Sequence, residues 1–355
     1  MATGVNAYAA INARVRVMYS TLLAPQEWSA LCESPDLAAL TLALKHTAYG
    51  PYLERVNDKD LTPRRMVYQI RNRLTDVYVS IIHMAPEHAR DVLLQMLRYY
   101  EVDNLKAVLR GIVTGATWDR VRFVLFPSTS MTNLPAQAMM EAGGVTPAVE
   151  LLQGTPYYDT LSYALKRYNA EQNLFPLEVA LDLSFWRDLW RDVNRLSNQE
   201  RNPALKTVGS LIDMNNIMWA IRYRVYHRLS EEEVINYTLP FGYHVHDSDI
   251  RAIAAGADIA QVVKRIYPNL QDVEALLDEG GKGLPELELQ LKRHVLQQCR
   301  AAFTGDPFTI GLPLAYLMLS DFEIQDLTVL IEAKSSKLKA EEFQPYLIAG
   351  CAENH

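Results

Sequence analysis

Cysteine is scarce in this chain of 355 residues, and its three cysteines, Cys32, Cys299 and Cys351, lie far apart. An odd number of cysteines at wide spacing predicts no disulfide framework and no zinc site, and it is typical of a reduced, cytoplasmic compartment. The sequence also lacks any run of about 18 uncharged apolar residues, so it predicts no membrane-spanning helix. Residues 1–4 have neither the basic nor the apolar region of a signal peptide.

Charge of one sign is not concentrated anywhere in the chain. The net charge is −7, and acidic and basic residues are interspersed throughout. Nucleic-acid binding usually needs a clustered basic face, which the sequence does not show. Low-complexity tracts are missing too, and 49% of the residues are hydrophobic. The chain therefore folds, and its length predicts two or three packed units, since single cores stop growing near about 250–300 residues.

What the sequence does contain is helical periodicity. Apolar residues recur at steps of three and four near the start, at Tyr8, Ile11, Val15, Met18 and Leu22. A second stripe follows at Met66, Ile70, Leu74, Val77 and Ile81. Pro86 predicts a break, after which a new helix covers residues 87–109. Only residues 122–126 could be read as a strand, so the pattern predicts an all-α fold.

An internal repeat is the strongest feature of the chain. Residues 101–110, 213–222 and 323–332 share one order: an acid, an apolar and a polar residue, Asn or Asp, Leu or Ile, two variable positions, two apolar residues and a charge. The fourth positions, Asn104, Asn216 and Asp326, are 112 and 110 residues apart. The third segment departs from the others because it has Asp326 in place of Asn and Glu332 in place of Arg.

Other pairs of residues keep the same period. Leu177-Glu178 recurs 110 residues later as Leu287-Glu288, and Ser34-Pro35 recurs 112 residues later as Thr146-Pro147. We expect Ser34 and Thr146 to cap helices, as Ser230 and Asp258 do in the last third. Chance recurrence of common helical patterns explains one such match but not an ordered set, so we predict three helical repeats at residues 1–113, 114–225 and 226–355.

Three similar units in one chain have a geometric consequence. They meet head to tail, and if each contact rotates by about a third of a turn the set closes into a ring. Such a ring has a hollow on its axis, which could hold the end of a rod-like partner.

Signatures of catalysis are weak. His244, His246 and Asp247 form the best metal-like cluster, but no second cluster supplies the remaining ligands, so a solvated loop with Asp247 as a helix cap is favoured. The glycine-rich segment around Lys282 does not match a phosphate-binding loop, because Gly283 stands where Ser or Thr is required.

Two further patterns leave alternatives open. Trp186 and Trp190 lie four residues apart, and we favour the protein core over an exposed anchor pair. Arg14-Val15-Arg16 and Arg222-Tyr223-Arg224 place arginines two residues apart on helices. One arginine of each pair would then face a neighbouring element, or both are ordinary solvated side chains.

The chain resembles a known family at its start, in its repeated motif and at its end. Residues 8–16, 101–110 and 306–327 resemble the C subunit of archaeal-type and V/A-type rotary ATPases, whose eukaryotic relative is the d subunit of the vacuolar proton pump. The resemblance covers nearly the whole chain. It implies a funnel of three pseudo-equivalent three-helix domains with pseudo-threefold symmetry. The motif residues that it marks as possible interface residues are Asn12, Arg14, Arg16, Asn104, Arg110, Asn216, Arg222 and Asp326.

The resemblance also implies a function. The family's subunit is a peripheral protein on the cytoplasmic face of the membrane, and it couples ATP turnover to ion transport. Its partners are the proteolipid subunits of the rotor ring and the central-stalk subunits D and F, with the stator membrane subunit left open. It uses no cofactor, no nucleic acid and no small-molecule substrate. Two other hypotheses remain: an unrelated helical adaptor, and a metal-dependent hydrolase that uses His244, His246 and Asp247.

Overall fold

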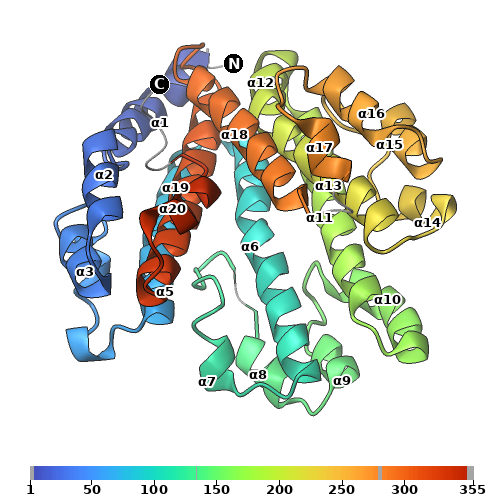
Figure 1. Cartoon of the computed structure of the whole chain (residues 1–355), viewed down its shortest axis with the longest axis horizontal. Helices are drawn as coiled ribbons and strands as arrows, with labels where there is room; N and C mark the ends of the chain where they lie inside the picture. The colour runs from blue at the N-terminus through green and yellow to red at the C-terminus, as the bar shows by residue number, and fades with distance from the viewer. Residues whose placement is uncertain (1–3, 133, 279–281, 350–355) are drawn as a thin grey trace. The chain divides into compact units, whose positions relative to one another are not determined.

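The computed structural model describes residues 4–132, 134–278 and 282–349 (Figure 1). The regular elements in these ranges are helices, and the only strand-like pairing among them is an isolated bridge between Thr129 and Thr132. The prediction of an all-α fold is therefore confirmed. No helix within the described ranges is long and apolar enough to cross a membrane.

Two compact units divide the chain. Unit 1 comprises Met1–Ala43 and Val193–His355, and unit 2 comprises Leu44–Asp192. Helices α3 (Leu37–Lys45) and α11 (Phe175–Arg195) run across the two boundaries between them. The division into three repeats stays a prediction.

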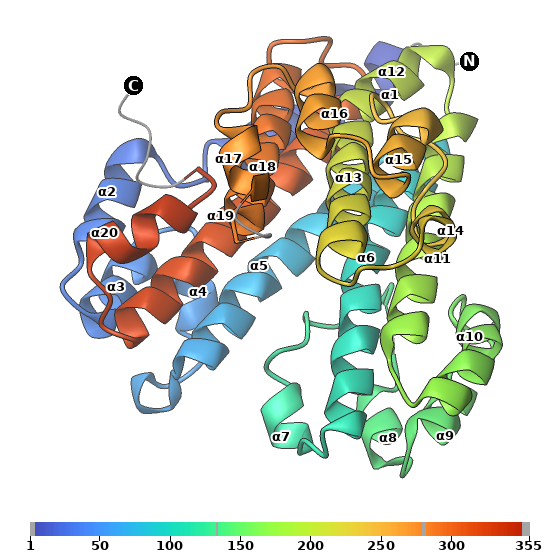
Figure 2. The same cartoon turned by 45° about the vertical axis from the view of Figure 1, so that its right-hand side comes forward.

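Unit 1 is built on two long antiparallel helices, α18 and α19 (Figure 2), and α1 packs against α19. The antiparallel direction follows from two contacts, Cys299 with Met318 and Lys292 with Gln325. The helices of this unit, besides the start of α3 and the end of α11, are α1 (Gly4–Tyr19), α2 (Pro25–Glu33), α12 (Asn198–Ala204), the π-helix η2 (Leu205–Gly209), α13 (Ser210–Val225), α14 (Glu231–Asn236), α15 (Asp247–Ala254), α16 (Ile259–Ile266), α17 (Val273–Asp278), α18 (Leu284–Ala302), α19 (Gly311–Ser335), α20 (Ala340–Phe343) and η3 (Gln344–Tyr346).

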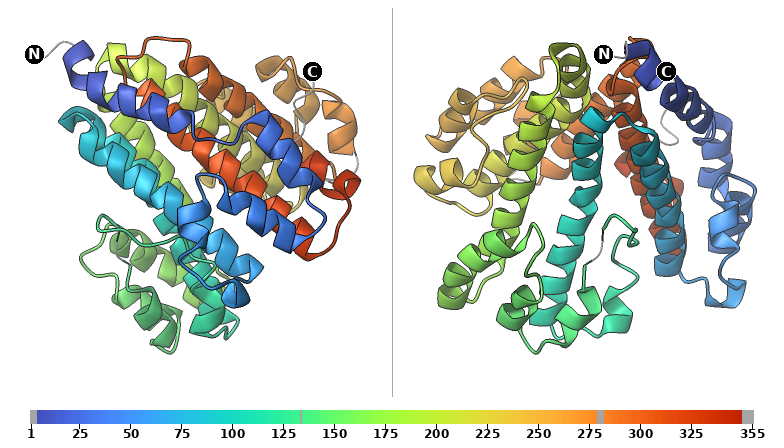
Figure 3. Two further views of the ribbon diagram at one scale, coloured as in Figure 1. Left: turned by 90° about the vertical axis from the view of Figure 1, so that its left-hand side faces the viewer. Right: turned by 180° about the vertical axis from the view of Figure 1, so that it is seen from behind.

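Unit 2 is built on the helical hairpin α5–α6. Short helices α7, α8 and α9 lie at the carboxyl end of α6, as all views in Figures 1 and 3 show. The helices of this unit, besides the end of α3 and most of α11, are α4 (Gly50–Leu53), η1 (Asp58–Asp60), α5 (Pro63–Met84), α6 (Glu87–Val113), α7 (Trp118–Val121), α8 (Ala136–Glu141), α9 (Val145–Glu150) and α10 (Tyr158–Glu171). Helix α10 fills most of residues 153–176, a stretch in which the sequence shows no recognisable motif.

Helix ends follow local chemistry. Pro86 separates α5 from α6 as predicted. Proline has no backbone N–H to donate to the preceding turn, so α5 ends before it and a new helix starts after it. Ser230 accepts the backbone N–H of Glu233 at the start of α14, and Asp258 accepts that of Gln261 at the start of α16. Both predicted caps are confirmed.

Three other predicted caps are wrong. At α3 the capping atom is Oδ1 of Asp36, which accepts the N–H of Ala39 at 2.9 Å, whereas Ser34 turns back to the carbonyl of Ala30. Thr146 lies inside α9 instead of before it. Asp247 begins α15 and pairs with Arg251, so the carboxylate that caps this helix start is that of Asp249, which accepts the N–H of His246.

Two aromatic side chains of α11, Phe185 and Trp186, are buried in the core of unit 2. Trp186 is 1% exposed and packs edge-on against Phe185, while Trp190 is half-buried. The preference for a core position over an exposed tryptophan pair is therefore confirmed for Trp186.

The cysteines differ from the expectation of a wholly reduced set. Cys299 is a buried free thiol on α18, and burial raises its pKa above the usual range. Cys32 on α2, in contrast, is disulfide-bonded, so the expectation is wrong for this residue. Cys351 lies outside the described residues.

Candidate functional site: the repeated motif on the long helices

The fourth motif position fixes a returning segment of chain to each long helix. On α6, Asn104 donates through Nδ2 to the carbonyl of Phe126 (3.0 Å) and accepts the N–H of Phe126 through Oδ1 (2.7 Å). On α13, Asn216 makes the same two bonds to Leu239, both at 2.8 Å. We call such a pair of bonds from one side chain to the backbone 22 or 23 residues later a latch. An asparagine amide suits it because it donates and accepts at once.

The third latch explains the departure in the sequence. Asp326 on α19 accepts the N–H groups of Ile348 (2.6 Å) and Ala349 (2.8 Å). Here the returning segment offers two donors, so an acceptor-only carboxylate fits where an amide would place its NH₂ against an N–H. Asn216 and Asp326 are fully buried, and Asn104 is half-buried. The three motif residues therefore perform one structural task with chemistry adapted to each segment.

The acid that opens the motif is buried in every copy. Glu101 accepts the hydroxyl of Tyr157 at 2.5 Å, Asp213 accepts the backbone N–H groups of Tyr243 and His244, and Glu323 accepts that of Leu23 at 2.7 Å. Burial raises the pKa of the Glu101 and Asp213 carboxyls above their usual range, against the opposing effect of these hydrogen bonds. Each carboxylate ties its long helix to a segment outside that helix.

The charge that closes the motif forms an ion pair in two copies. Arg110 on α6 donates to both carboxylate oxygens of Glu178 on α11, at 2.6 and 2.9 Å. Arg222 on α13 pairs with Glu288 on α18. Two separate sequence matches, the arginines and the Leu-Glu pairs, thus describe one contact. In the third copy Glu332 stands exposed on α19, so this contact does not recur there.

The family-motif residues on α1 have different surroundings. Asn12 is 3% exposed, and neither atom of its amide has a hydrogen-bond partner among the described residues. Arg14 and Arg16 are both exposed, and Arg16 donates to the carbonyl of Phe303 at 3.3 Å. Arg16 thus contacts the residue after α18 and Arg222 contacts α18, while both side chains stay partly accessible to solvent, so the two alternatives for these pairs stay open.

Sequence reasoning missed Glu200. This residue of α12 is 7% exposed, and its Oε2 accepts both the hydroxyl of Tyr8 (3.2 Å) and the N–H of Ile310 (2.8 Å). It thereby ties α12 to α1 and to the residue just before α19. Its polar neighbours in the sequence predict a solvated helix start, and its partners lie 192 and 110 residues away, so no local signal could reveal it.

The metal-like cluster is not assembled as a metal site. Within the described part of the chain, no three His, Cys, Asp or Glu side chains are grouped so that they could hold a metal ion. His244 and His246 use their backbone N–H groups to bind Asp213 and Asp249, and Asp247 pairs with Arg251. Gly280 and Gly281 of the glycine-rich segment lie outside the described residues.

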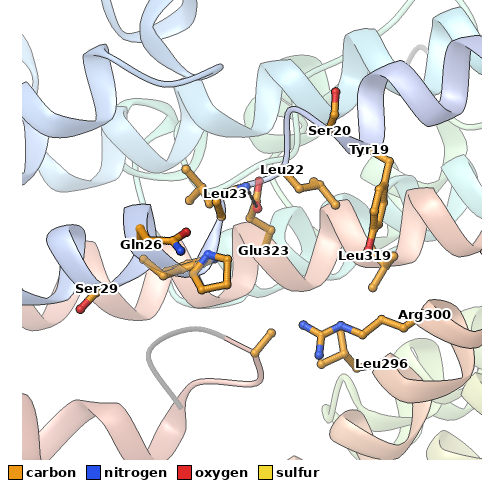
Figure 4. A pocket seen from close by; sticks show the side chains of 14 residues that line it. Tyr19, Ser20, Leu22, Leu23, Gln26, Ser29, Leu296, Arg300, Leu319 and Glu323 are labelled. Atoms are coloured by element: carbon orange, nitrogen blue, oxygen red, sulfur yellow. Dashed lines mark hydrogen bonds between the residues drawn. The ribbon is translucent and has the colours of Figure 1, made fainter. Parts of the chain in front are cut away.

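A cleft of about 630 Å³ opens in unit 1 between the α1–α2 connection, α18 and α19 (Figure 4). Its lining mixes aromatic and apolar side chains with two charged ones, Arg300 from α18 and Glu323 from α19. Glu323 is the first motif residue of the third copy, so the repeated motif contributes a buried carboxylate to the wall of this cleft.

The chain is similar in sequence to C subunits of archaeal A-type ATP synthases. The C subunit of the A-type ATP synthase of Methanocaldococcus jannaschii is 26% identical over 350 residues, which is 96% of this chain and 86% of the relative. The corresponding C subunits of Methanothermobacter thermautotrophicus and Pyrococcus abyssi are 23% identical over 329 and 342 residues, covering 91% and 95% of this chain and 83% and 89% of theirs. The family described as ATP synthase (C/AC39) subunit matches residues 11–346, and the chain belongs to this family.

Proposed function

We propose that this chain is a non-catalytic rotor subunit of a V/A-type ATPase or ATP synthase. It links the central-stalk subunits D and F to the proteolipid ring on the cytoplasmic face of the membrane, and so couples ATP turnover to proton or sodium transport. The observation that carries the proposal is the family match over residues 11–346, in a family of ATP synthase subunits.

The latches support a mechanical role. A part that transmits torque must resist internal slip, and packed helices transmit strain because their interiors hardly compress. Each long helix of the motif is tied twice to other segments, once by its opening acid and once by its latch, as on α13 through Asp213 and Asn216. Segments that would otherwise be free to shift are thus held by buried hydrogen bonds.

The test is to purify the tagged chain from detergent-solubilised membranes of its own cells and to identify the recovered partners by mass spectrometry. We expect proteolipid, D and F subunits in stoichiometric amounts. A matched control is a tagged variant with Ile217→Asp, which should lose its fold and therefore its partners. Recovery of none of these subunits from membranes shown to contain the complex would favour an unrelated helical adaptor instead.

A second measurement addresses coupling. Complexes lacking the chain should still hydrolyse ATP in their soluble head, but ATP-driven ion movement should be lost, since the proposed link to the ring is missing. Adding back the purified chain should restore transport. Transport that persists without the chain would contradict the proposed role even if the chain binds the complex.

A further inference from the structure

The carboxyl end of the chain returns to its first helices, and each side of this meeting has a cysteine nearby. Cys32 lies near the end of α2, and Cys351 follows two residues after Ala349, the last residue that the structure describes. The N–H of Ala349 is held by Asp326 of α19 in the third latch. The proposed function uses neither cysteine, so the pair calls for a separate explanation.

The number of cysteines identifies the partner of Cys32. The sequence has three cysteines, and Cys32 is disulfide-bonded. Cys299 is excluded as its partner, because it is a free thiol buried on α18, with its Sγ atom 3.9 Å from Sδ of Met318. Cys351 is then the remaining cysteine of the chain to which Cys32 can be bonded.

The described residues on both sides agree with such a bond. Trp28 of α2 and Ala349 line the same cleft in unit 1, which has a volume of about 630 Å³. Trp28 and Cys32 are four residues apart and both are buried, so they share one face of α2. Two residues of extended chain span about 7 Å, and a disulfide joins Cα atoms about 5.5–6 Å apart. The chain beyond Ala349 is thus long enough to cross a cleft of this size.

Helix α19 holds both sides of this meeting in place through hydrogen bonds. Nζ of Lys334 donates to the backbone carbonyl of Cys32 at 2.7 Å. Asp326, about two turns earlier on the same helix, accepts the N–H groups of Ile348 and Ala349. The backbone of Cys32 and the residues just before Cys351 are therefore fixed to one rigid element, which favours a bond between the two sulfur atoms.

We propose that Cys32 and Cys351 form a redox-sensitive disulfide that fastens the carboxyl end of the chain to α2 and reinforces the third latch. When the S–S bond forms, the two thiols lose two protons and two electrons. A low-molecular-weight disulfide takes up both and is reduced to two thiols, by exchange through a mixed disulfide, and a dithiol reverses the step. Because the bond lies two residues beyond Ala349, it limits the movement of the residues that bind Asp326.

Peptide mapping by mass spectrometry tests the pairing on the full chain. The purified chain is equilibrated with a small-molecule disulfide, its free thiols are alkylated in denaturant, and it is digested with trypsin without reduction. Trypsin places the three cysteines in separate peptides, residues 17–45, 294–300 and 340–355. We expect residues 17–45 to be linked to residues 340–355, and Cys299 to be alkylated. Alkylation of both Cys32 and Cys351, or a link from Cys32 to Cys299, would overturn the proposal.

Hydrogen exchange with mass spectrometry tests the link to the latch. The readout is the protection of amides in residues 347–349, which include the two donors to Asp326. We expect a several-fold loss of this protection when a dithiol reduces the purified chain. The latch segments around Phe126 and Leu239 are internal controls, because their latches contain no cysteine. Equal protection of residues 347–349 with and without the dithiol would contradict the reinforcement of the latch.

Matched variants show whether the effect of the dithiol comes from this bond. Cys351→Ser should have the low protection of the reduced chain under both conditions, whereas Cys299→Ala should respond to the dithiol as the original chain does. A response of Cys351→Ser equal to that of the original chain would overturn the proposal. Circular dichroism verifies that each variant folds, and if Cys299→Ala does not, the comparison of Cys351→Ser with the original chain decides. All these readouts use the purified chain, so they do not depend on the proposed rotor role.

Discussion

At the scale of single residues, the motif shows how one position can keep a task while its chemistry changes. Asn104 and Asn216 face one donor and one acceptor, whereas Asp326 faces two donors. The choice between amide and carboxylate is therefore set by the backbone of the returning segment and not by the helix that carries the residue.

This leads to a prediction about the third latch. Asp326→Asn should lower stability by about 1–3 kcal/mol, because its NH₂ group would meet a buried N–H that then stays unpaired. Thermal unfolding followed by circular dichroism measures the effect. The matched control is Glu332→Gln, the same acid-to-amide change at an exposed position of α19, which should leave the midpoint almost unchanged. Equal midpoints for the two variants would show that the latch of Asp326 contributes little.

The opposite change is predicted to be more damaging on α13. Asn216→Asp puts a fully buried carboxylate oxygen against the carbonyl of Leu239, and a buried charge without a partner costs several kcal/mol. The adjacent Asn215→Asp is a suitable control, since its half-buried side chain donates to the carbonyl of Leu211 in its own helix and not to a returning segment among the described residues. A midpoint for the Asn216 variant as high as that of the control would contradict the latch.

The buried acid Glu101 gives a prediction on pH. Its pKa is raised by burial, so the folded chain holds this proton more tightly than the unfolded chain. Stability from this group is therefore present at low pH and is lost as the pH rises from about 4.5, the usual value, through the raised one. Glu101→Gln still accepts the Tyr157 hydroxyl, so it should melt at or above the temperature of the original chain at pH 8, with a smaller difference at pH 5. A variant that melts lower at pH 8 would mean that the ionised carboxylate stabilises the fold.

At the scale of helices, the repeat register makes a further prediction. Leu105 on α6 and Ile217 on α13 occupy the same motif position and are both 0% exposed. Leu105→Asp or Ile217→Asp should leave the chain unfolded near room temperature, so that thermal melting shows no cooperative transition. The reason is that the cost of a buried charge is a large part of a typical folding free energy of about 5–15 kcal/mol. Val113→Asp, at a 52% exposed position at the end of α6, is the control and should be tolerated.

The sequence predicts the buried faces of helices and the repeated motif, because both follow from the regular spacing of residues along a helix. Apolar spacing identifies which face of a helix is buried. It predicts one stripe through Tyr8, Ile11, Val15, Met18 and Leu22, and the first four are at most 8% exposed. Leu22 departs from the prediction, because it lies beyond the end of α1 and is half-buried. Helix starts are less predictable, because Ser34 competes with a nearby alternative, Asp36, for the same N–H groups. Contacts between distant segments, such as those of Glu200, leave no periodic trace in the sequence.

At the scale of the whole molecule, the long helices α6, α13 and α19 repeat one way of holding distant chain segments, although the chain divides into two compact units. The latch of α6 lies in unit 2, and those of α13 and α19 lie in unit 1. The latch therefore recurs three times, although the chain has only two compact units. The division into three repeats and their arrangement as a funnel stay predictions.

The last prediction joins the latches to the proposed coupling role. If torque passes through this chain, a loosened latch should reduce transport more than hydrolysis, because a yielding link lets the stalk turn without driving the ring. Complexes rebuilt with Asp326→Asn, assayed well below its melting temperature, should hydrolyse ATP at nearly the original rate but move fewer ions per ATP. Complexes with Glu332→Gln should keep the original ratio. An unchanged ratio in the Asp326 variant, with its lowered stability verified, would mean that the latch serves folding alone.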